Sequence, residues 1–275
     1  MTQRLLLLEP PGQPLASLIL FTGGEGTLKL SDGGQLRAGA GNFLVRTRQR
    51  WAGQGFQVAV VDAPSDHPDN ISRNDFRSSA EHAADMAVVI DELRRRADVP
   101  VWLVGTSRGT TSAAAIGIRL QTRVAGLVLT STINHDRGNV AAMDLSQLTL
   151  PVLLVQHRHD QCKESLPANV QPVLDGLLKA RPRALLEFDG GQDRGDPCQA
   201  WAAHGYNGIE DEVISRSRPG SNSISPELGL AVVIRGRAIG SHAQGWSWCV
   251  QSYTTVTMAL AGLTVSVVLV MDAGI

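Results

Sequence analysis

The segment 105–109, with the sequence GTSRG, places Ser107 in the pattern G-x-S-x-G. An apolar run at 101–105 leads into it, and a helix-period stretch of small residues at 108–120 follows. Between a strand and a helix, this pattern is typical of a serine on a strained turn whose hydroxyl is exposed as a nucleophile. Glycine is required beside the serine because strand and helix pass close together there. The alternative is a tight turn with a helix-capping serine.

A second glycine-rich loop, TGGEGT at 22–27, follows the strand-like run 17–22. Glycines allow backbone amides to approach a negative charge that develops during a reaction. We predict an oxyanion hole formed by the amides of Gly24 and Arg108, with Glu25 as the neighbouring alternative to Gly24. A phosphate-binding loop is the competing interpretation, but the lysine that such a loop needs is missing at the required spacing.

Candidate acids and bases follow later strand-like runs. Asp160 comes after the run 152–156 and is the predicted acid, with Asp136, after the run 126–131, as the alternative. Beyond the run 184–188 the histidines are His204, which opens a glycine-rich loop, and His242, which lies in a segment of unusual composition. We predict His204 as the base, because it can take the proton of Ser107 while Asp160 holds its other nitrogen.

The elements that must position these residues alternate between apolar strand-like runs and helical stretches. Strands are expected at 4–8, 17–22, 56–61, 101–105, 126–131, 152–156 and 184–188, and helices at 42–52, 79–96, 108–120 and 168–180. Such alternation predicts an α/β fold with a mostly parallel twisted sheet flanked by helices. Ligands bind at the carboxyl ends of the strands in such sheets, where the candidate residues stand.

Four groups of residues together resemble the α/β-hydrolase superfamily, and more narrowly its small lidless bacterial hydrolases, often labelled dienelactone-hydrolase-like. They are LFTGGEG at 20–26, VVDAPSD at 60–66, GTSRGT at 105–110, and DPC at 196–198 with HGY at 204–206. The resemblance covers about residues 4–214 and implies Ser107, Asp160 and His204 as nucleophile, acid and base. Such proteins end with a further helix after the histidine loop, whereas residues 215–220 here are not expected to continue a helix.

The expected function is hydrolysis of carboxylic esters of compact, soluble substrates through an acyl-enzyme on Ser107. Only about twenty residues separate the runs 126–131 and 152–156, too few for a cap domain. The alternatives are a thioesterase or peptidase with the same triad, or a non-catalytic binding protein with this fold. Neither a cofactor nor a metal is expected, and the oligomeric state stays open.

Two cysteines flank the predicted acid and base. Cys162 lies two residues after Asp160, and Cys198 lies six residues before His204. If the two loops converge on one site, the thiols are neighbours, so we predict a disulfide between them, with two reduced thiols as the alternative. A zinc site made of His157, His159, Asp160, Cys162 and His204 was the competing hypothesis, but its spacing matches no zinc pattern.

The amino-acid composition excludes several classes of protein. The 275 residues carry a net charge of -1 with 43% hydrophobic residues, which indicates a globular chain without the basic surface of a nucleic-acid-binding protein. We predict a hydrolase domain at 1–214 and an atypical segment at 215–275, where six of 61 residues are charged, against 45 of 214 before it. Residues 250–271 are long enough for a bilayer span, but their hydroxyl side chains favour strands or an ill-ordered extension.

The first residues form no secretory signal, which favours a cytoplasmic protein. A strand so close to Met1 suggests that the natural start lies upstream, and the predicted disulfide points the same way. With a truncated start and an oxidised Cys162–Cys198 pair, the protein would be periplasmic or secreted.

Overall fold

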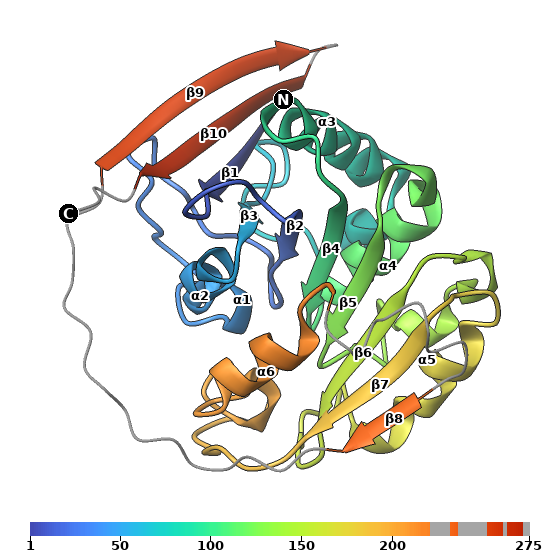
Figure 1. Ribbon diagram of the computed structural model, residues 1–275. Coiled ribbons are helices and arrows are strands. Elements are labelled where there is room, and N and C mark those ends of the chain that lie inside the picture. The colour runs from blue at the N-terminus through green and yellow to red at the C-terminus, as the bar shows by residue number, and fades with distance from the viewer. Residues whose placement is uncertain (221–231, 236–251, 261–262, 272–275) are drawn as a thin grey trace.

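The structure is a computed structural model that describes residues 1–220, 232–235, 252–260 and 263–271. Within these residues the strands form one sheet in the order β8-β7-β6-β5-β4-β2-β3-β1-β10-β9 (Figure 1). In chain order the strands are β1 (Thr2–Leu8), β2 (Ala16–Phe21), β3 (Phe56–Val61), β4 (Val101–Thr106), β5 (Gly126–Thr130), β6 (Val152–His157), β7 (Arg183–Phe188), β8 (Val232–Arg235), β9 (Ser252–Leu260) and β10 (Leu263–Met271).

The sheet is mostly parallel, as predicted. Every neighbouring pair from β3 through β2 and β4 to β8 is parallel, whereas β1 runs antiparallel to β3. The central strands β2 to β6 are buried along their whole length. Such strands read as continuous Val- and Leu-rich runs because both faces of the sheet are covered.

The helices lie between the strands on both faces of the sheet (Figure 1). They are α1 (Phe43–Arg46), α2 (Arg48–Gly53), α3 (Ala80–Arg96), α4 (Gly109–Arg119), α5 (Gln171–Gly176) and α6 (Glu210–Ser217). Short 3-10 turns are η1 (Arg73–Ser78), η2 (Gln121–Arg123), η3 (Val140–Ala142), η4 (Leu145–Gln147), η5 (Pro167–Asn169) and η6 (Ala203–Gly205). Ser79 caps α3, since its side chain accepts a hydrogen bond from the amide of His82.

Two apolar clusters form the core, one on each face of the sheet. Along β1, Leu5 and Leu7 belong to the cluster that contains residues of α3, α4 and α5, whereas Leu6 and Leu8 belong to the cluster with residues of α1, α2 and α6. This division follows from the pleat, which directs successive side chains to opposite faces. The sheet is thereby fixed between two layers, and the carboxyl ends of β4, β5 and β6 share one edge.

Three helical predictions were wrong in extent. The helix expected at 42–52 is divided at Thr47, whose hydroxyl donates to the carbonyl of Phe43 at 2.7 Å. The helix expected at 168–180 is only the six-residue α5. Pro172 near its start lacks the amide hydrogen that an earlier turn would need, and Leu177, with a ψ of 55°, leaves the helical conformation directly after Gly176. The helix after His204 continues to Ser217, aided by the ion pair between Glu212 and Arg216 at 3.1 Å.

The described parts of the segment 215–275 add strands at both edges of the sheet. β8 pairs parallel with β7, and β10 pairs parallel with β1 and antiparallel with β9 (Figure 1). This agrees with the strand hypothesis for 250–271. Among the described residues, no helix combines the length and the hydropathy needed to cross a bilayer. His242 and Cys249 lie outside the described residues, and the domain boundary at residue 214 stays a prediction.

Candidate active site

Ser107 lies on the turn between β4 and α4. Its φ of 52° is in the left-handed region, which a residue with a side chain adopts only under strain. The turn is held by two hydrogen bonds, from the Ser107 amide to the carbonyl of Thr130 (3.0 Å) and from the Thr110 amide to the carbonyl of Ser107 (2.9 Å). Ser107 is half-buried.

The glycines beside Ser107 are required for the close approach of strand and helix. A Cβ at Gly105 would lie 2.6 Å from the carbonyl oxygen of Gly109. A Cβ at Gly109 would collide with the carbonyl oxygen of Phe21 in β2. Both contacts involve backbone atoms that cannot rotate away, which is the steric reason for the G-x-S-x-G pattern at this turn.

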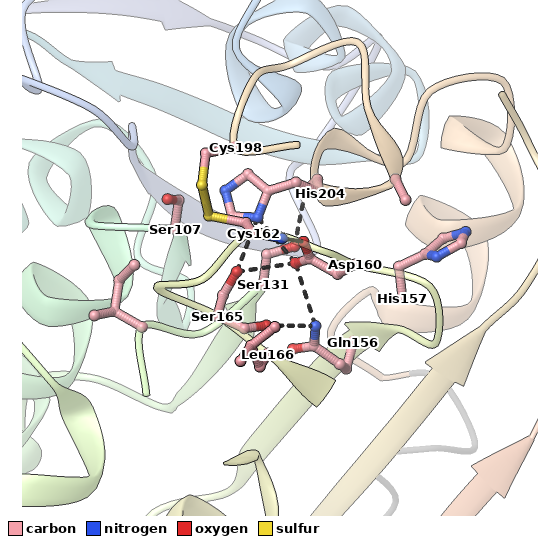
Figure 2. Close-up of polar contacts among 12 residues, drawn as sticks. Ser107, Ser131, Gln156, His157, Asp160, Cys162, Ser165, Leu166, Cys198 and His204 are labelled. Atoms are coloured by element: carbon pink, nitrogen blue, oxygen red, sulfur yellow. Dashed lines mark hydrogen bonds and ion pairs between the residues drawn. A yellow bond between two sulfur atoms is a disulfide. The ribbon is translucent and has the colours of Figure 1, made fainter. Parts of the chain in front are cut away.

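Asp160 lies in the loop after β6, His204 lies in η6, and their side chains contact each other. The Nδ1 atom of His204 lies 2.9 Å from Oδ2 of Asp160, and their side chains are 6% and 0% exposed. We assign the hydrogen to Nδ1, which makes Nε2 the hydrogen-bond acceptor of the neutral ring. Nε2 is buried and has no hydrogen-bond partner among the described residues. In the view of Figure 2 the imidazole lies between Asp160 and Ser107.

The carboxylate of Asp160 is held by further donors. Ser165 donates to Oδ2 at 2.9 Å, Gln156 approaches the same oxygen at 3.3 Å, and the amide of Cys162 donates to Oδ1 at 2.9 Å (Figure 2). The hydroxyl oxygen of Ser165 also lies 3.0 Å from Nδ1 of His204. Sequence reasoning missed Ser165 and Gln156, since neither belongs to a motif.

A hydrogen-bond network holds the backbone of His204 against the sheet. The hydroxyl oxygen of Ser131, after β5, lies 2.8 Å from the carbonyl oxygen of His204 and 3.0 Å from the Tyr206 hydroxyl. Tyr206 in turn donates to the carbonyl of Val155 in β6 at 2.8 Å. Burial raises the pKa of Tyr206 above its ordinary value, so the phenol stays protonated as a donor. The histidine loop is thereby fixed to two strand ends.

The loop that starts after β2 lies against Ser107. A Cβ at Gly23 would be 2.9 Å from Cβ of Ser107, and Gly24 has a φ of 58°. Arg108, which follows Ser107, donates from Nε and Nη2 to Glu164 at 3.0 and 2.9 Å. Hydrogen bonding to Glu164 raises the pKa of Arg108 above its ordinary value. The side chain of Arg108 is therefore paired with a carboxylate, while its amide belongs to the turn.

Other candidate residues have structural partners. Asp136, the alternative acid, is 59% exposed and pairs with Nδ1 of His135 at 3.0 Å. Asp62, at the end of β3, accepts hydrogen bonds from the amides of Leu28 (2.6 Å) and Leu30 (2.7 Å) and so organises the loop that follows the glycines. His157 lies 2.9 Å from the carbonyl of Gly190 through Nε2.

The predicted disulfide is present. Cys162 and Cys198 form a bond of 2.04 Å that links the loop of Asp160 to the loop of His204 (Figure 2). The sulfur of Cys162 is therefore bonded to another sulfur and is no ligand for the zinc site considered above. Among the described residues, Asp66, His67 and Glu81 form a group whose potential ligand atoms lie within 4.8 Å of one another, and Asp66 and Glu81 are exposed.

No family model matches this chain, and no curated protein matches it. It is similar in structure to the protein XC6422 of Xanthomonas campestris, an α/β serine hydrolase without lid, at 17% identity and a TM-score of 0.51 over 79% of this chain and 89% of that one. It is also similar to a cold-adapted esterase from an Arctic intertidal metagenomic library, at 17% identity and a TM-score of 0.50 over 76% and 85% of the two chains. The chain therefore has the α/β-hydrolase fold.

Proposed function

We propose that the protein is a serine hydrolase that cleaves carboxylic esters through an acyl-enzyme on Ser107. One observation carries the proposal: a buried imidazole whose Nδ1 is held by Asp160 and whose Nε2 has no partner in the described chain. A buried nitrogen without a hydrogen-bond partner lowers the stability of the fold, and this cost is removed when the nitrogen accepts a hydrogen bond from a hydroxyl group. Ser107, half-buried on a strained turn, would supply that hydroxyl.

The proposed reaction has two steps. In the first, the oxygen of Ser107 attacks the ester carbonyl carbon, His204 takes the hydroxyl proton and then returns it to the departing alcohol. In the second, a water gives its proton to His204 and attacks the acyl-enzyme, which releases the carboxylic acid and restores Ser107. In both steps the amides of Gly24 and Arg108 are proposed to stabilise the oxyanion, and Asp160 stabilises the imidazolium.

A compact substrate is supported by the connection between β5 and β6, which is short. A hydrophilic pocket of about 150 Å³ lies beside the start of α4, lined by Arg77, Arg108 and Glu164 among others, and its lining includes none of Ser107, Asp160 and His204. The segment between β5 and β6 contains only the short turns η3 and η4, so it forms no lid.

Labelling with a fluorophosphonate probe tests the nucleophile, and a panel of short p-nitrophenyl esters, thioesters and peptides tests the bond that is cleaved. We expect the folded protein to be labelled, Ser107→Ala to be unlabelled, and the acetyl and butyryl esters to be hydrolysed faster than the octanoyl ester. Equal labelling of Ser107→Ala, or no labelling of the folded protein, would exclude the enzyme and favour the non-catalytic alternative.

A further inference from the structure

Arg77, in η1, is a buried cation surrounded by oxygen atoms. Its residue is 3% exposed. Nε donates to the hydroxyl of Ser72 at 2.8 Å, and Nη1 donates to the hydroxyl of Ser112 at 3.1 Å. Nη2 donates to two backbone carbonyls, those of Thr22 at 3.1 Å and Gly24 at 3.2 Å.

The hydrogen-bond partners that the structure describes for this guanidinium are all neutral. Within the part of the chain that the structure describes, no carboxylate forms an ion pair with Arg77. Burial, and secondarily the charge of Arg108, lowers the pKa of Arg77 to about 9. A buried charge without a counter-charge reduces the stability of the fold relative to an apolar side chain of similar size. The function of Arg77 therefore lies in the groups that it holds.

Those groups are the backbone of the proposed oxyanion loop. The Thr22 and Gly24 carbonyls stand on either side of Gly23, which lies against Ser107. In a trans peptide the C=O and N–H point in opposite directions. Because the Gly24 carbonyl points toward Arg77, the amide of Glu25 in the same peptide group points away from Arg77. In the same way, the Thr22 carbonyl points toward Arg77 and the amide of Gly23 points away from it. Ser72 also donates to the Gly24 carbonyl, at 3.0 Å.

Arg77 also contacts the second element that supplies the oxyanion hole. Ser112, its Nη1 partner, lies in α4, the helix that begins directly after Arg108. One side chain thus connects the loop after β2 to the helix after the nucleophile. We propose that Arg77 is the positioning residue of the oxyanion hole. It fixes the 22–25 loop against α4 and so sets the position of the Gly24 amide, and through the Thr22 and Gly24 carbonyls it polarises the neighbouring amides of Gly23 and Glu25, the latter being the alternative donor. A charged donor on a carbonyl strengthens the N–H of the same peptide group as a donor.

The inference rests on the proposed function and is tested by Arg77→Lys, which keeps the charge but cannot donate to four oxygens at once. The hole acts mainly in the transition state, so we expect kcat to fall about 10–100-fold with KM changed less than twofold. The affinity for phenylboronic acid, which binds the serine oxygen and becomes a tetrahedral anion, is expected to fall in parallel. The matched control is Arg94→Lys, since Arg94 lies on α3 and donates to the carbonyl of Arg123 at 3.1 Å.

A purely structural arginine would give another result. Normal kcat and boronate affinity in Arg77→Lys, with a lower melting temperature, would overturn the proposal. If that variant does not fold, Ser112→Ala decides, because it removes the Nη1 partner of Arg77 on α4 and leaves both loop carbonyls bonded: a threefold to tenfold loss of kcat supports the inference, and wild-type kcat overturns it. Wild-type protein without Ser107-dependent labelling would overturn the proposed function and this inference together.

Discussion

The acid of the proposed triad is an acceptor for several donors at once. Both carboxylate oxygens of Asp160 receive hydrogen bonds, from the amide of Cys162 and from Ser165, in addition to the contact with His204. An ionised carboxylate suits this environment because it accepts at every lone pair and donates at none. An amide side chain would turn an NH2 group toward at least one of these donors.

We therefore expect Asp160→Asn to lower kcat by about 10³–10⁴, because the asparagine favours the wrong tautomer of His204. Steady-state kinetics on a short ester, with circular dichroism to confirm folding, measures the effect. Asp136→Asn is the control, since Asp136 is 59% exposed and pairs only with His135 among the described residues. A larger loss in Asp136→Asn than in Asp160→Asn would reassign the acid.

At the scale of elements, the site depends on two loops that are separated along the chain by α5 and β7. The loop of Asp160 follows β6, the loop of His204 follows β7, and the Cys162–Cys198 bond joins them across 36 residues. The chain-entropy model assigns about 3–4 kcal/mol to a closed loop of this length. Tyr206 and Ser131 hold His204 to the sheet from the other side.

The double variant Cys162→Ser with Cys198→Ser is expected to lose about 3 kcal/mol of unfolding free energy, because the unfolded chain regains the freedom that the bond removes. Urea denaturation measures this loss, and thiol titration of unreduced, denatured wild type should find one free thiol among the three cysteines. We expect the double variant to retain measurable esterase activity, since the hydrogen bonds of Tyr206 and Ser131 remain. Three free thiols in the wild type would contradict the pairing.

The elements that carry the site were predictable because their signals are local. Apolar runs gave β3 with correct bounds and the other strands of the central sheet to within two residues. Ser107 directly follows β4 and Asp160 lies close to the end of β6, whereas His204 lies in η6, after a long loop that follows β7. The hydrogen-bonding partners were not predictable. Ser165 and Arg77 act through tertiary contacts, and a serine or arginine outside a motif has no spacing that reveals such a contact. The division of α1 from α2 at Thr47 depends likewise on a side-chain hydrogen bond.

At the scale of the whole molecule, the buried carboxyl of Asp85 lowers the stability of the folded protein at neutral pH. Asp85, in α3, is 4% exposed, and its Oδ2 has no hydrogen-bond partner among the described residues. Its pKa is raised to about 7, chiefly by burial and also by the charges of Asp66 and Glu81, while the amino group of Met1 acts in the opposite direction. In the unfolded chain the same carboxyl titrates near its ordinary value of about 3.9.

The folded protein therefore binds this proton more tightly than the unfolded chain does. By linkage, the contribution of Asp85 to stability decreases as the pH rises from about 4 to about 7 and stays low above that range. We expect Asp85→Asn to raise the free energy of unfolding by about 2 kcal/mol at pH 8 and to change it little at pH 4.5. Urea denaturation at both pH values measures the difference.

Asp91→Asn is the control on the same helix. The side chain of Asp91 is 56% exposed and pairs with Arg123, so this substitution should slightly destabilise the protein at pH 8. An Asp85→Asn gain of equal size at both pH values would mean that packing, and not the proton, accounts for the effect.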